Sequence, residues 1–246
     1  MGKNKLAKFA EMAHFENVFQ PTYEGLMQQG FPLKGLWGTS YFKNNAPIIL
    51  ELGCGKGEYT ISLAERYPEK NFIGIDIKGA RMFTGAKLAN QKGLKNVAFI
   101  RTKIENSDLL FGRGEISEIW LTFPDPQMKN VRKRLTSTWF LCRYKRFLAG
   151  SGIIHLKTDS AFQYNYTLGM VQRNNFKISA QTDNLYGSGL LNEILGIRTF
   201  YEKQWTDRGI PIKYLAFIPG EADHFEEPEE EYEKDSYRSF GRSARQ

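Results

Sequence analysis

The 246-residue sequence lacks the features that mark several other classes of protein. No apolar run approaches the roughly 18 to 20 residues that a membrane-spanning helix needs, and the opening MGKNKLAKFAEMAHF has no apolar signal core. The two cysteines, Cys54 and Cys142, lie far apart, and the three histidines are isolated, so no metal-ligand spacing is present. We therefore expect a cytoplasmic protein with no membrane contact, no disulfide and no metal.

Acidic residues are scarce outside one segment. Residues 221–235 hold nine of the 27 acids, whereas residues 1–220 carry 30 bases and 18 acids. A strongly basic body is typical of a protein that binds a polyanion, because neutralised phosphates release counterions; a bias toward solubility is the alternative. The acidic segment predicts a solvated, mobile tail, and an autoinhibitory mimic of nucleic acid is the weaker possibility.

The apolar pattern predicts strands that alternate with helices. This alternation indicates an α/β fold with a doubly wound, mostly parallel seven-stranded sheet, and the last two strands suit an antiparallel hairpin at one edge. We expect an N-terminal extension at 1–45, one domain at 46–220 and a flexible acidic tail at 221–246. The predicted strands are 47–53, 71–77, 96–102, 115–123, 151–158, 176–182 and 211–217, and the predicted helices are 57–68, 78–94, 135–148 and 160–175.

A glycine loop, ELGCGKGE, follows the first predicted strand. Glycines let the backbone approach a ligand closely before a helix begins. Asp76 ends the second predicted strand, at a distance that suits a carboxylate bonded to ribose hydroxyls. We expect the loop to bind a cofactor through Gly53, Gly55 and Gly57.

The residues around this loop argue against a phosphate ligand. The third glycine of G-x-G-x-x-G is replaced by Glu58, and Glu51 precedes the loop, so both acids would repel a pyrophosphate. The missing G-K-[ST] excludes a Walker loop. S-adenosyl-L-methionine, which is cationic and has no phosphate, fits better. A dinucleotide site and a glycine turn without a ligand are the alternatives.

The stretch EIWLTFPDPQMKNVRKRL ends an apolar strand at Asp125, between two prolines. The first and fourth predicted strands flank the expected switch in strand order, where ligands of such sheets bind, so Asp125 should face the glycine loop. Pro124 and Pro126 fix φ and stiffen the turn. The alternative is a turn that only ends the strand.

Acids are absent from residues 129–146, which hold seven bases. This basic strip beside a carboxylate suggests a nucleic-acid substrate, with phosphate contacts that position it and a pocket that specifies it. We expect Lys129 and Arg132 to bind substrate. The strip consists of Lys129, Arg132, Lys133, Arg134, Arg143, Lys145 and Arg146.

Five segments in the same order resemble the tRNA (guanine-N(7)-)-methyltransferase family, over about residues 45 to 218. They are LELGCGKGE, GIDIKGARM, IWLTFPDPQMKNVRKRL, HLKTDS and RTFYEKQWTDRGIPIKYLAF. The resemblance implies a Rossmann-like fold and transfer of a methyl group from S-adenosyl-L-methionine to nitrogen 7 of the variable-loop guanosine of tRNA, position 46 in conventional numbering.

The resemblance also implies roles for individual residues. Glu51, Asp76 and Asp125 take the positions of the cofactor-side acids, and Asp125 is also the expected catalytic residue. Lys129 and Asp159 take substrate positions. The family's T-x-F-E element matches Thr199, Phe200, Tyr201 and Glu202, which adds Thr199, Tyr201 and Glu202 to the expected substrate site.

The sequence departs from the family pattern at two places. The third-strand aspartate of the family aligns near Lys103, with Glu105 as the expected substitute in the cofactor site. The segment after Pro126 is about two residues shorter than usual, which affects how tRNA docks.

Alternatives remain for the two late acids and for the whole chain. Asp159 could instead cap the helix that follows it, and Glu202 could form a surface salt bridge. The chain could also methylate another RNA, a small molecule or a protein, or could bind RNA without catalysis. The sequence leaves both a monomer and a homodimer open.

Overall fold

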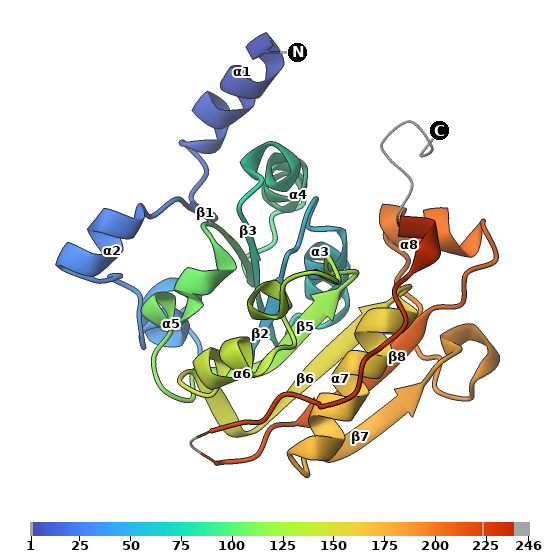
Figure 1. Ribbon diagram of the computed structural model, residues 1–246. Coiled ribbons are helices and arrows are strands. Elements are labelled where there is room, and N and C mark those ends of the chain that lie inside the picture. Colours follow the sequence, from blue (N-terminus) through green and yellow to red (C-terminus); the bar gives the residue numbers. More distant parts are fainter. Residues whose placement is uncertain (1, 223, 239–246) are drawn as a thin grey trace.

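The computed structural model describes residues 2–222 and 224–238, which form an eight-stranded sheet with helices on both faces (Figure 1). The strand order is β1-β4-β3-β2-β5-β6-β8-β7, and only the pairs that include β8 are antiparallel among these described strands. The strands are β1 (Val18–Phe19), β2 (Ile48–Leu52), β3 (Asn71–Asp76), β4 (Val97–Arg101), β5 (Ile116–Thr122), β6 (Leu148–Thr158), β7 (Lys177–Thr182) and β8 (Lys213–Ile218).

All seven predicted strands are present, and the predicted antiparallel edge is confirmed. The eighth strand, β1, comes from the N-terminal extension and pairs with β4. The order of strands reverses at β2, which pairs with β3 on one side and with β5 on the other. The carboxyl ends of β4, β3, β2, β5 and β6 therefore lie along one edge of the sheet, which we call the reactive edge.

Two layers of helices bury the two faces of the sheet in separate apolar clusters (Figure 1). One face packs against α3 (Glu58–Arg66), α4 (Gly79–Gln91) and the insertion at 183–212, which carries α8 (Phe200–Thr206). The other face packs against α2 (Tyr23–Gln29), α5 (Ser107–Leu110), α6 (Thr138–Tyr144) and α7 (Ala161–Arg173). The parallel strands are therefore buried on both faces, as is usual for such sheets.

Helix α6 is shorter than the helix predicted at 135–148. Ile116 at the start of β5 pairs with Leu148, and its backbone N–H donates to the carbonyl of Phe147. The end of the apolar run therefore enters the sheet. Strand β6 starts at Leu148 rather than at the predicted residue 151.

The N-terminal extension is part of the core. A short π-helix at Trp37–Phe42 places the fully buried Trp37 among aromatic rings, and its indole N–H donates to the carbonyl of Leu110 at 3.1 Å. Phe19 of β1 meets the Trp37 ring edge-on, with 5.1 Å between the centroids. Helix α1 (Gly2–Met12) lies against α4. The extension therefore folds over the sheet.

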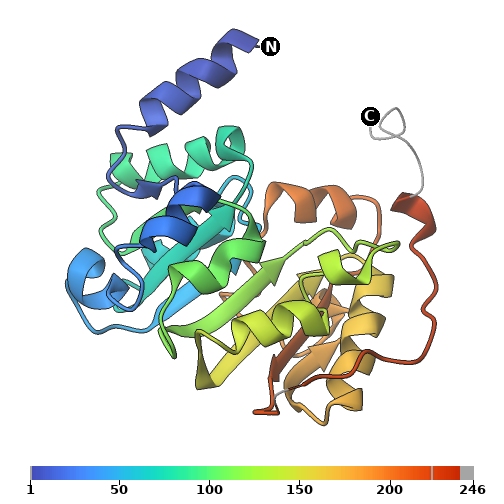
Figure 2. The ribbon, with the colours of Figure 1, turned by 60° about the vertical axis from the view of Figure 1, so that its left-hand side comes forward.

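Residues 224–238, which we call the C-terminal strap, lie against the domain, although most of their side chains are exposed. The strap crosses α7 and ends beside α8 (Figure 2). Glu227 accepts hydrogen bonds from the backbone N–H and hydroxyl of Thr138, at 3.0 and 2.7 Å, and from the hydroxyl of Tyr166. Charge composition predicted solvation, and most acids of the strap are exposed, but Glu227 and Asp235 accept backbone N–H groups at the N-termini of α6 and α7. Asp223 and residues 239–246 of the predicted tail lie outside the described part.

Candidate active site

The glycine loop lies between β2 and α3 in a conformation that requires glycine. Gly53, Gly55 and Gly57 have φ of 82°, 56° and 72°, in the left-handed region that side chains disfavour. A Cβ atom at Gly57 would lie 2.7 Å from the ring of Phe99, so the loop also packs tightly on the sheet. The predicted close approach of backbone at this position is therefore built into the loop.

Asp76 ends β3 and holds the glycine loop. Its carboxylate accepts hydrogen bonds from the backbone N–H groups of Gly55, at 2.9 Å, and Lys78, at 2.7 Å. The sequence predicted Asp76 as a ribose-binding acid. The structure brings it to the loop at the reactive edge, half-buried, where a ligand lying over the loop would meet it.

Glu51 lies beneath the loop and is 4% exposed. Its carboxylate accepts hydrogen bonds from the backbone N–H and hydroxyl of Thr60 in α3 and from the hydroxyl of Thr122 in β5. Burial raises the pKa of Glu51 to about 7, although these hydrogen bonds act to lower it. Glu51 therefore joins β2, α3 and β5 under the loop, and its carboxylate is turned away from solvent.

Asp125 projects from the reactive edge beside the glycine loop, because β5 pairs directly with β2. Its side chain is exposed, and Oδ1 accepts a hydrogen bond from the backbone N–H of Gln127 at 3.1 Å. The residues on either side of Pro-Asp-Pro, Phe123 and Gln127, have φ of 50° and 47°. Left-handed backbone at two non-glycine residues costs energy and persists where the surroundings fix it. The turn thus holds Asp125 in one place.

The basic strip has two parts, an exposed tip near Asp125 and a remainder whose side chains bond to other parts of the protein. Lys129, Arg132 and Lys133 are exposed. Arg134 is instead 6% exposed and donates to the carbonyls of Gln127 and Met128 at 3.2 and 3.3 Å. The expectation that Arg134 belongs to a phosphate-binding strip is therefore wrong: it braces the loop after Pro-Asp-Pro.

The last three bases of the strip also have contacts within the protein. The guanidinium of Arg143 lies 3.4 Å from the ring centroid of Trp139. Arg146 forms an ion pair with Asp108 at 2.6 Å, and Lys145 donates to the carbonyls of residues 221 and 222. The surface open to a polyanion is therefore centred on the tip that follows Asp125.

Asp159 follows β6 at the reactive edge and is fully buried. Its Oδ2 accepts a hydrogen bond from the hydroxyl of Tyr237 in the C-terminal strap at 2.8 Å. The cap of α7 is Ser160, whose hydroxyl accepts the backbone N–H of Gln163, so the alternative that Asp159 caps this helix is wrong. The strap closes this part of the edge.

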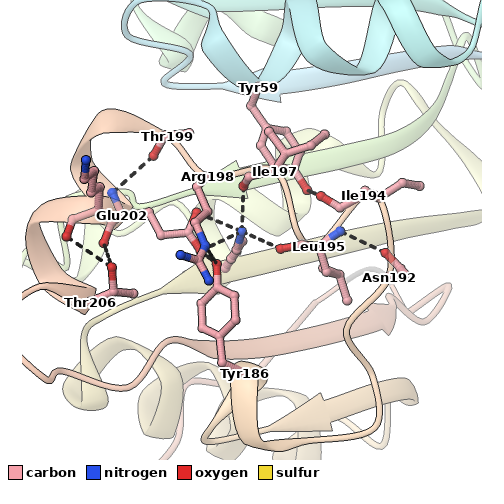
Figure 3. A network of polar contacts seen from close by, with 12 residues as sticks. Tyr59, Tyr186, Asn192, Ile194, Leu195, Ile197, Arg198, Thr199, Glu202 and Thr206 are labelled. Carbon is pink, nitrogen blue, oxygen red and sulfur yellow. Dashed lines mark hydrogen bonds and ion pairs between the residues drawn. The ribbon is translucent and has the colours of Figure 1, made fainter.

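Glu202 is fully buried and forms an ion pair with Lys157, the residue next to the end of β6, at 2.8 Å. It also accepts a hydrogen bond from the hydroxyl of Tyr186 at 2.6 Å, and Lys157 donates to the carbonyls of Leu195 and Ile197 (Figure 3). Burial lowers the pKa of Lys157, while Glu202 acts to raise it. The alternative of a surface salt bridge at Glu202 is wrong, because the pair lies in the interior.

The other residues of the T-x-F-E element have different environments. Thr199 is the N-cap of α8, and its hydroxyl accepts the backbone N–H of Glu202 at 3.3 Å. Tyr201 is 38% exposed and lies under the guanidinium of Arg81, which is 5.6 Å from the ring centroid. Helix α8 reaches the glycine loop, since the backbone N–H of Phe200 donates to Glu58 at 3.1 Å. Phe200, which is 50% exposed, and Tyr201 are therefore the exposed groups of this motif.

A cavity of about 610 Å³ opens next to Asp76. It is lined by residues after β3 and β4, including Ile77, Thr102 and Glu105, and by residues 20–24 of the N-terminal extension. Lys103 and Glu105 both line the cavity, and both are exposed. This location is the one that Glu105 needs if it stands in for the family's third-strand aspartate. The size of the cavity suits a small molecule. The glycine loop, Asp76 and this cavity together fit S-adenosyl-L-methionine.

The structure also shows residues that the sequence did not single out. Lys157 lies within HLKTDS, but a lysine at the end of an apolar strand gives no sign of a partner 45 residues later. Tyr237 lies in the segment expected to be solvated. Among the described residues, no group of three or more His, Cys, Asp or Glu side chains lies together as metal ligands would. Nor is any helix within 2–222 and 224–238 long and apolar enough to cross a membrane.

Comparisons with known proteins agree with this site. A family model with the description "Putative methyltransferase" matches residues 45–215. The tRNA (guanine-N(7)-)-methyltransferase of Bacteroides fragilis is 55% identical, covering 100% of this chain and 97% of the relative. That of Porphyromonas gingivalis is 58% identical, covering 95% of this chain and 98% of the relative.

A solved structure shows the same fold without close sequence similarity. The 16S rRNA methyltransferase KamB has a TM-score of 0.56 and 13% identity, covering 73% of this chain and 91% of that one. The fold is therefore the Rossmann-like methyltransferase fold. Together with the near full-length similarity of its relatives, this shows that the chain belongs to the tRNA (guanine-N(7)-)-methyltransferase family.

Proposed function

We propose that this chain forms 7-methylguanosine in tRNA by transferring a methyl group from S-adenosyl-L-methionine to nitrogen 7 of the variable-loop guanosine. The observation that carries the proposal is the family membership over nearly the whole chain. The exposed Asp125, held next to the glycine loop by a strained turn, supplies the matching chemistry. The same edge carries the exposed bases that a tRNA backbone needs.

The reaction needs positioning more than proton transfer. Nitrogen 7 of guanine has an in-plane lone pair and no proton, and S-adenosyl-L-methionine supplies a methyl group on a positively charged sulfur. Placing donor and acceptor at about 3 to 3.5 Å can supply several kcal/mol by proximity alone. We assign to Asp125 the stabilisation of positive charge as it develops on the purine, or acceptance of hydrogen bonds from the Watson–Crick edge. A general base is not required.

Seven residues are proposed for the cofactor. Gly53, Gly55 and Gly57 bring backbone close to it, and Asp76 is placed to accept hydrogen bonds from the ribose once a ligand competes for its oxygens. Glu51 acts from beneath the loop by holding it in place. Glu105 lies on the cavity wall, and Asp125 borders the methyl end.

Six residues are proposed for tRNA. Lys129 and Arg132 are exposed next to Asp125 and suit phosphate contacts, and Tyr201 is exposed beside the loop. Thr199 positions Tyr201 by capping α8. The buried acids, Asp159 and Glu202, can contact guanine only if Tyr237 or Lys157 gives way.

The organisation of the chain follows from these roles. We propose a methyltransferase domain at 46–220, an N-terminal extension at 1–45 and a C-terminal segment at 221–246. Strand β1 of the extension lies on the cofactor side, and residues 224–238 of the C-terminal segment lie on the substrate side. We propose that the chain acts in the cytoplasm, because its proposed substrate is tRNA. Sedimentation of the purified chain would distinguish a monomer from a homodimer.

The test is to incubate purified protein with labelled S-adenosyl-L-methionine and unmodified tRNA, and to map the label. Label at nitrogen 7 of the variable-loop guanosine is expected. Label on another atom, or only on protein or small molecules, would contradict the proposal and favour a different methyltransferase. Binding of tRNA without any binding of the cofactor would instead favour a non-catalytic RNA-binding protein.

A further inference from the structure

The N-terminal extension supplies one wall of the cavity beside Asp76, which suggests a role beyond packing. We propose that residues 20–24 complete the subsite for the adenosine of S-adenosyl-L-methionine, with Tyr23 as a contact of the adenine ring. The inference rests on the proposed function for the identity of the cofactor. It adds a cofactor-binding segment that precedes the glycine loop in the chain and lies outside the proposed methyltransferase domain.

The position of the cavity along the reactive edge indicates which end of the cofactor it takes. The edge runs from Asp125 after β5, past the glycine loop after β2, to Asp76 at the end of β3 and the residues after β4. A cofactor with its methyl group at Asp125 and its ribose at Asp76 places its base farther along the edge. The cavity lies there, lined by Ile77 and Thr102.

The chemistry of the cavity suits a neutral aromatic ring. Among its lining side chains, Arg101 and Lys103 are balanced by Glu24 and Glu105, so the cavity does not favour an anion such as a phosphate. Its polar and apolar groups come from both walls, as in small-molecule sites.

Two large apolar side chains on the cavity wall are exposed. Tyr23 is 56% exposed on α2, whose Leu26 lies in the core, and Ile77, directly after β3, is 51% exposed. An adenine ring bound in the cavity would cover apolar surface that now meets water. The side-chain amide of Asn106 donates to Thr102 at 3.0 Å, which leaves the amide oxygen as the end that can accept a hydrogen bond from the amino group of adenine.

The wall formed by the extension is held in place from three directions. Strand β1 pairs with β4 immediately before it. Within it, the side chain of Gln20 accepts a hydrogen bond from Arg101 at 3.1 Å, and the hydroxyl of Thr22 caps α2. The guanidinium of Arg101 also lies 4.3 Å from the ring centroid of Phe9 in α1. A wall fixed in this way loses little conformational entropy when a ligand binds.

The test is the affinity for S-adenosylhomocysteine, measured by titration calorimetry without tRNA. Replacing Tyr23→Ala should weaken binding roughly tenfold, as expected for loss of one contact between an aromatic side chain and a base. Tyr23→Phe should retain the affinity of the wild type. Met27→Ala is the matched control, because Met27 is 59% exposed on the same helix but does not line the cavity.

Hydrogen exchange provides a second measurement that does not depend on catalysis. Backbone amides of residues 20–29 should exchange more slowly in wild-type protein when S-adenosylhomocysteine is added. Unchanged exchange in this segment, together with Tyr23→Ala binding within twofold of wild type, would overturn the inference while the methylation of tRNA still stood. Failure of the wild type to bind S-adenosylhomocysteine would overturn both the proposed function and the inference.

Discussion

The two ends of the reactive edge differ in how open they are. At the cofactor end, beside β3 and β4, a cavity of about 610 Å³ is lined by residues that include the exposed Tyr23 and Ile77. At the substrate end, beside β6, Asp159 and Glu202 are fully buried and bonded to Tyr237 and Lys157. The end where we propose the cofactor is therefore open, whereas the end where we propose the substrate is occupied by the protein's own groups.

This difference suggests an order of events. A preformed cavity can take the cofactor with little rearrangement, but a guanine that reaches Asp159 must replace the hydroxyl of Tyr237. A base that leaves its stack in tRNA adds a cost of a few kcal/mol. Asp125 stands between the two ends and is exposed, so it can serve both.

The largest effect is expected at Asp125, where the two ends meet. Replacing Asp125→Ala should lower kcat by about 10²–10³-fold, because a fixed charge beside the reacting base is lost. The affinities for S-adenosylhomocysteine and tRNA should stay within a few-fold of wild type. Glu69→Ala, at an exposed acid near the opposite end of β3, is the control and should leave kcat unchanged. An active Asp125→Ala variant would remove this residue from the mechanism.

The next effect concerns the closed substrate end. Replacing Lys157→Met leaves the carboxylate of Glu202 buried without its partner and should lower the free energy of unfolding by about 3–5 kcal/mol, measured by urea denaturation. The double variant Lys157→Met with Glu202→Leu should recover part of this loss. A loss below about 1 kcal/mol for Lys157→Met alone would mean that Glu202 is accessible to solvent and ligands.

A smaller effect should distinguish a closed substrate end from a permanently sealed one. Replacing Tyr237→Phe removes the hydrogen bond to Asp159, so we expect the KM for tRNA to fall a few-fold while the affinity for S-adenosylhomocysteine is unchanged. Tyr232→Phe is the control within the strap, since its hydroxyl donates to Glu230 away from Asp159. An unchanged KM together with lower stability would show that Asp159 has only a structural role.

The smallest expected effect is a difference in the salt dependence of tRNA affinity between the exposed tip of the basic strip and the rest of the strip. Replacing Arg132→Ala should reduce the slope of log tRNA affinity against log salt concentration by about one, because one phosphate contact is lost. Arg146→Ala should change the slope less, since this side chain pairs with Asp108. Equal changes in the two variants would show that tRNA contacts the whole strip.

The sequence predicted the parts of this site that depend on local patterns. The seven strands, the meeting of Asp76 with the glycine loop and the place of Asp125 follow from apolar runs and turn residues, since parallel strands bring their carboxyl ends to one edge. Which charged side chains are buried and which are exposed did not follow from these patterns. Arg134 and Arg132 are indistinguishable in a run of bases, but only Arg134 finds carbonyls and two aromatic rings within reach.

Pairs between residues far apart in the sequence were not predicted either, because local patterns do not show which distant segments meet. Nothing local in HLKTDS links Lys157 to Glu202. Nor does the local sequence of the strap indicate that its acids lie beside a helix N-terminus and Arg173. The burial of a charge depends on which distant segments fold against it. Composition alone therefore did not predict which acids of residues 224–238 bond to the domain, as Glu227 and Asp235 do, and which are exposed, as Glu231 and Glu233 are.

The position of the strap at the end of the chain has a consequence for the order in which the protein is completed during synthesis. Glu227, Asp235 and Tyr237 are synthesised after all eight strands, yet they complete the ends of α6, α7 and β6. These contacts, which finish the tRNA side, can therefore form only after the segments that carry the sheet and the cofactor cavity have been made. A nascent chain, surrounded by the tRNAs that serve its own synthesis, would not yet have the mature surface that meets them.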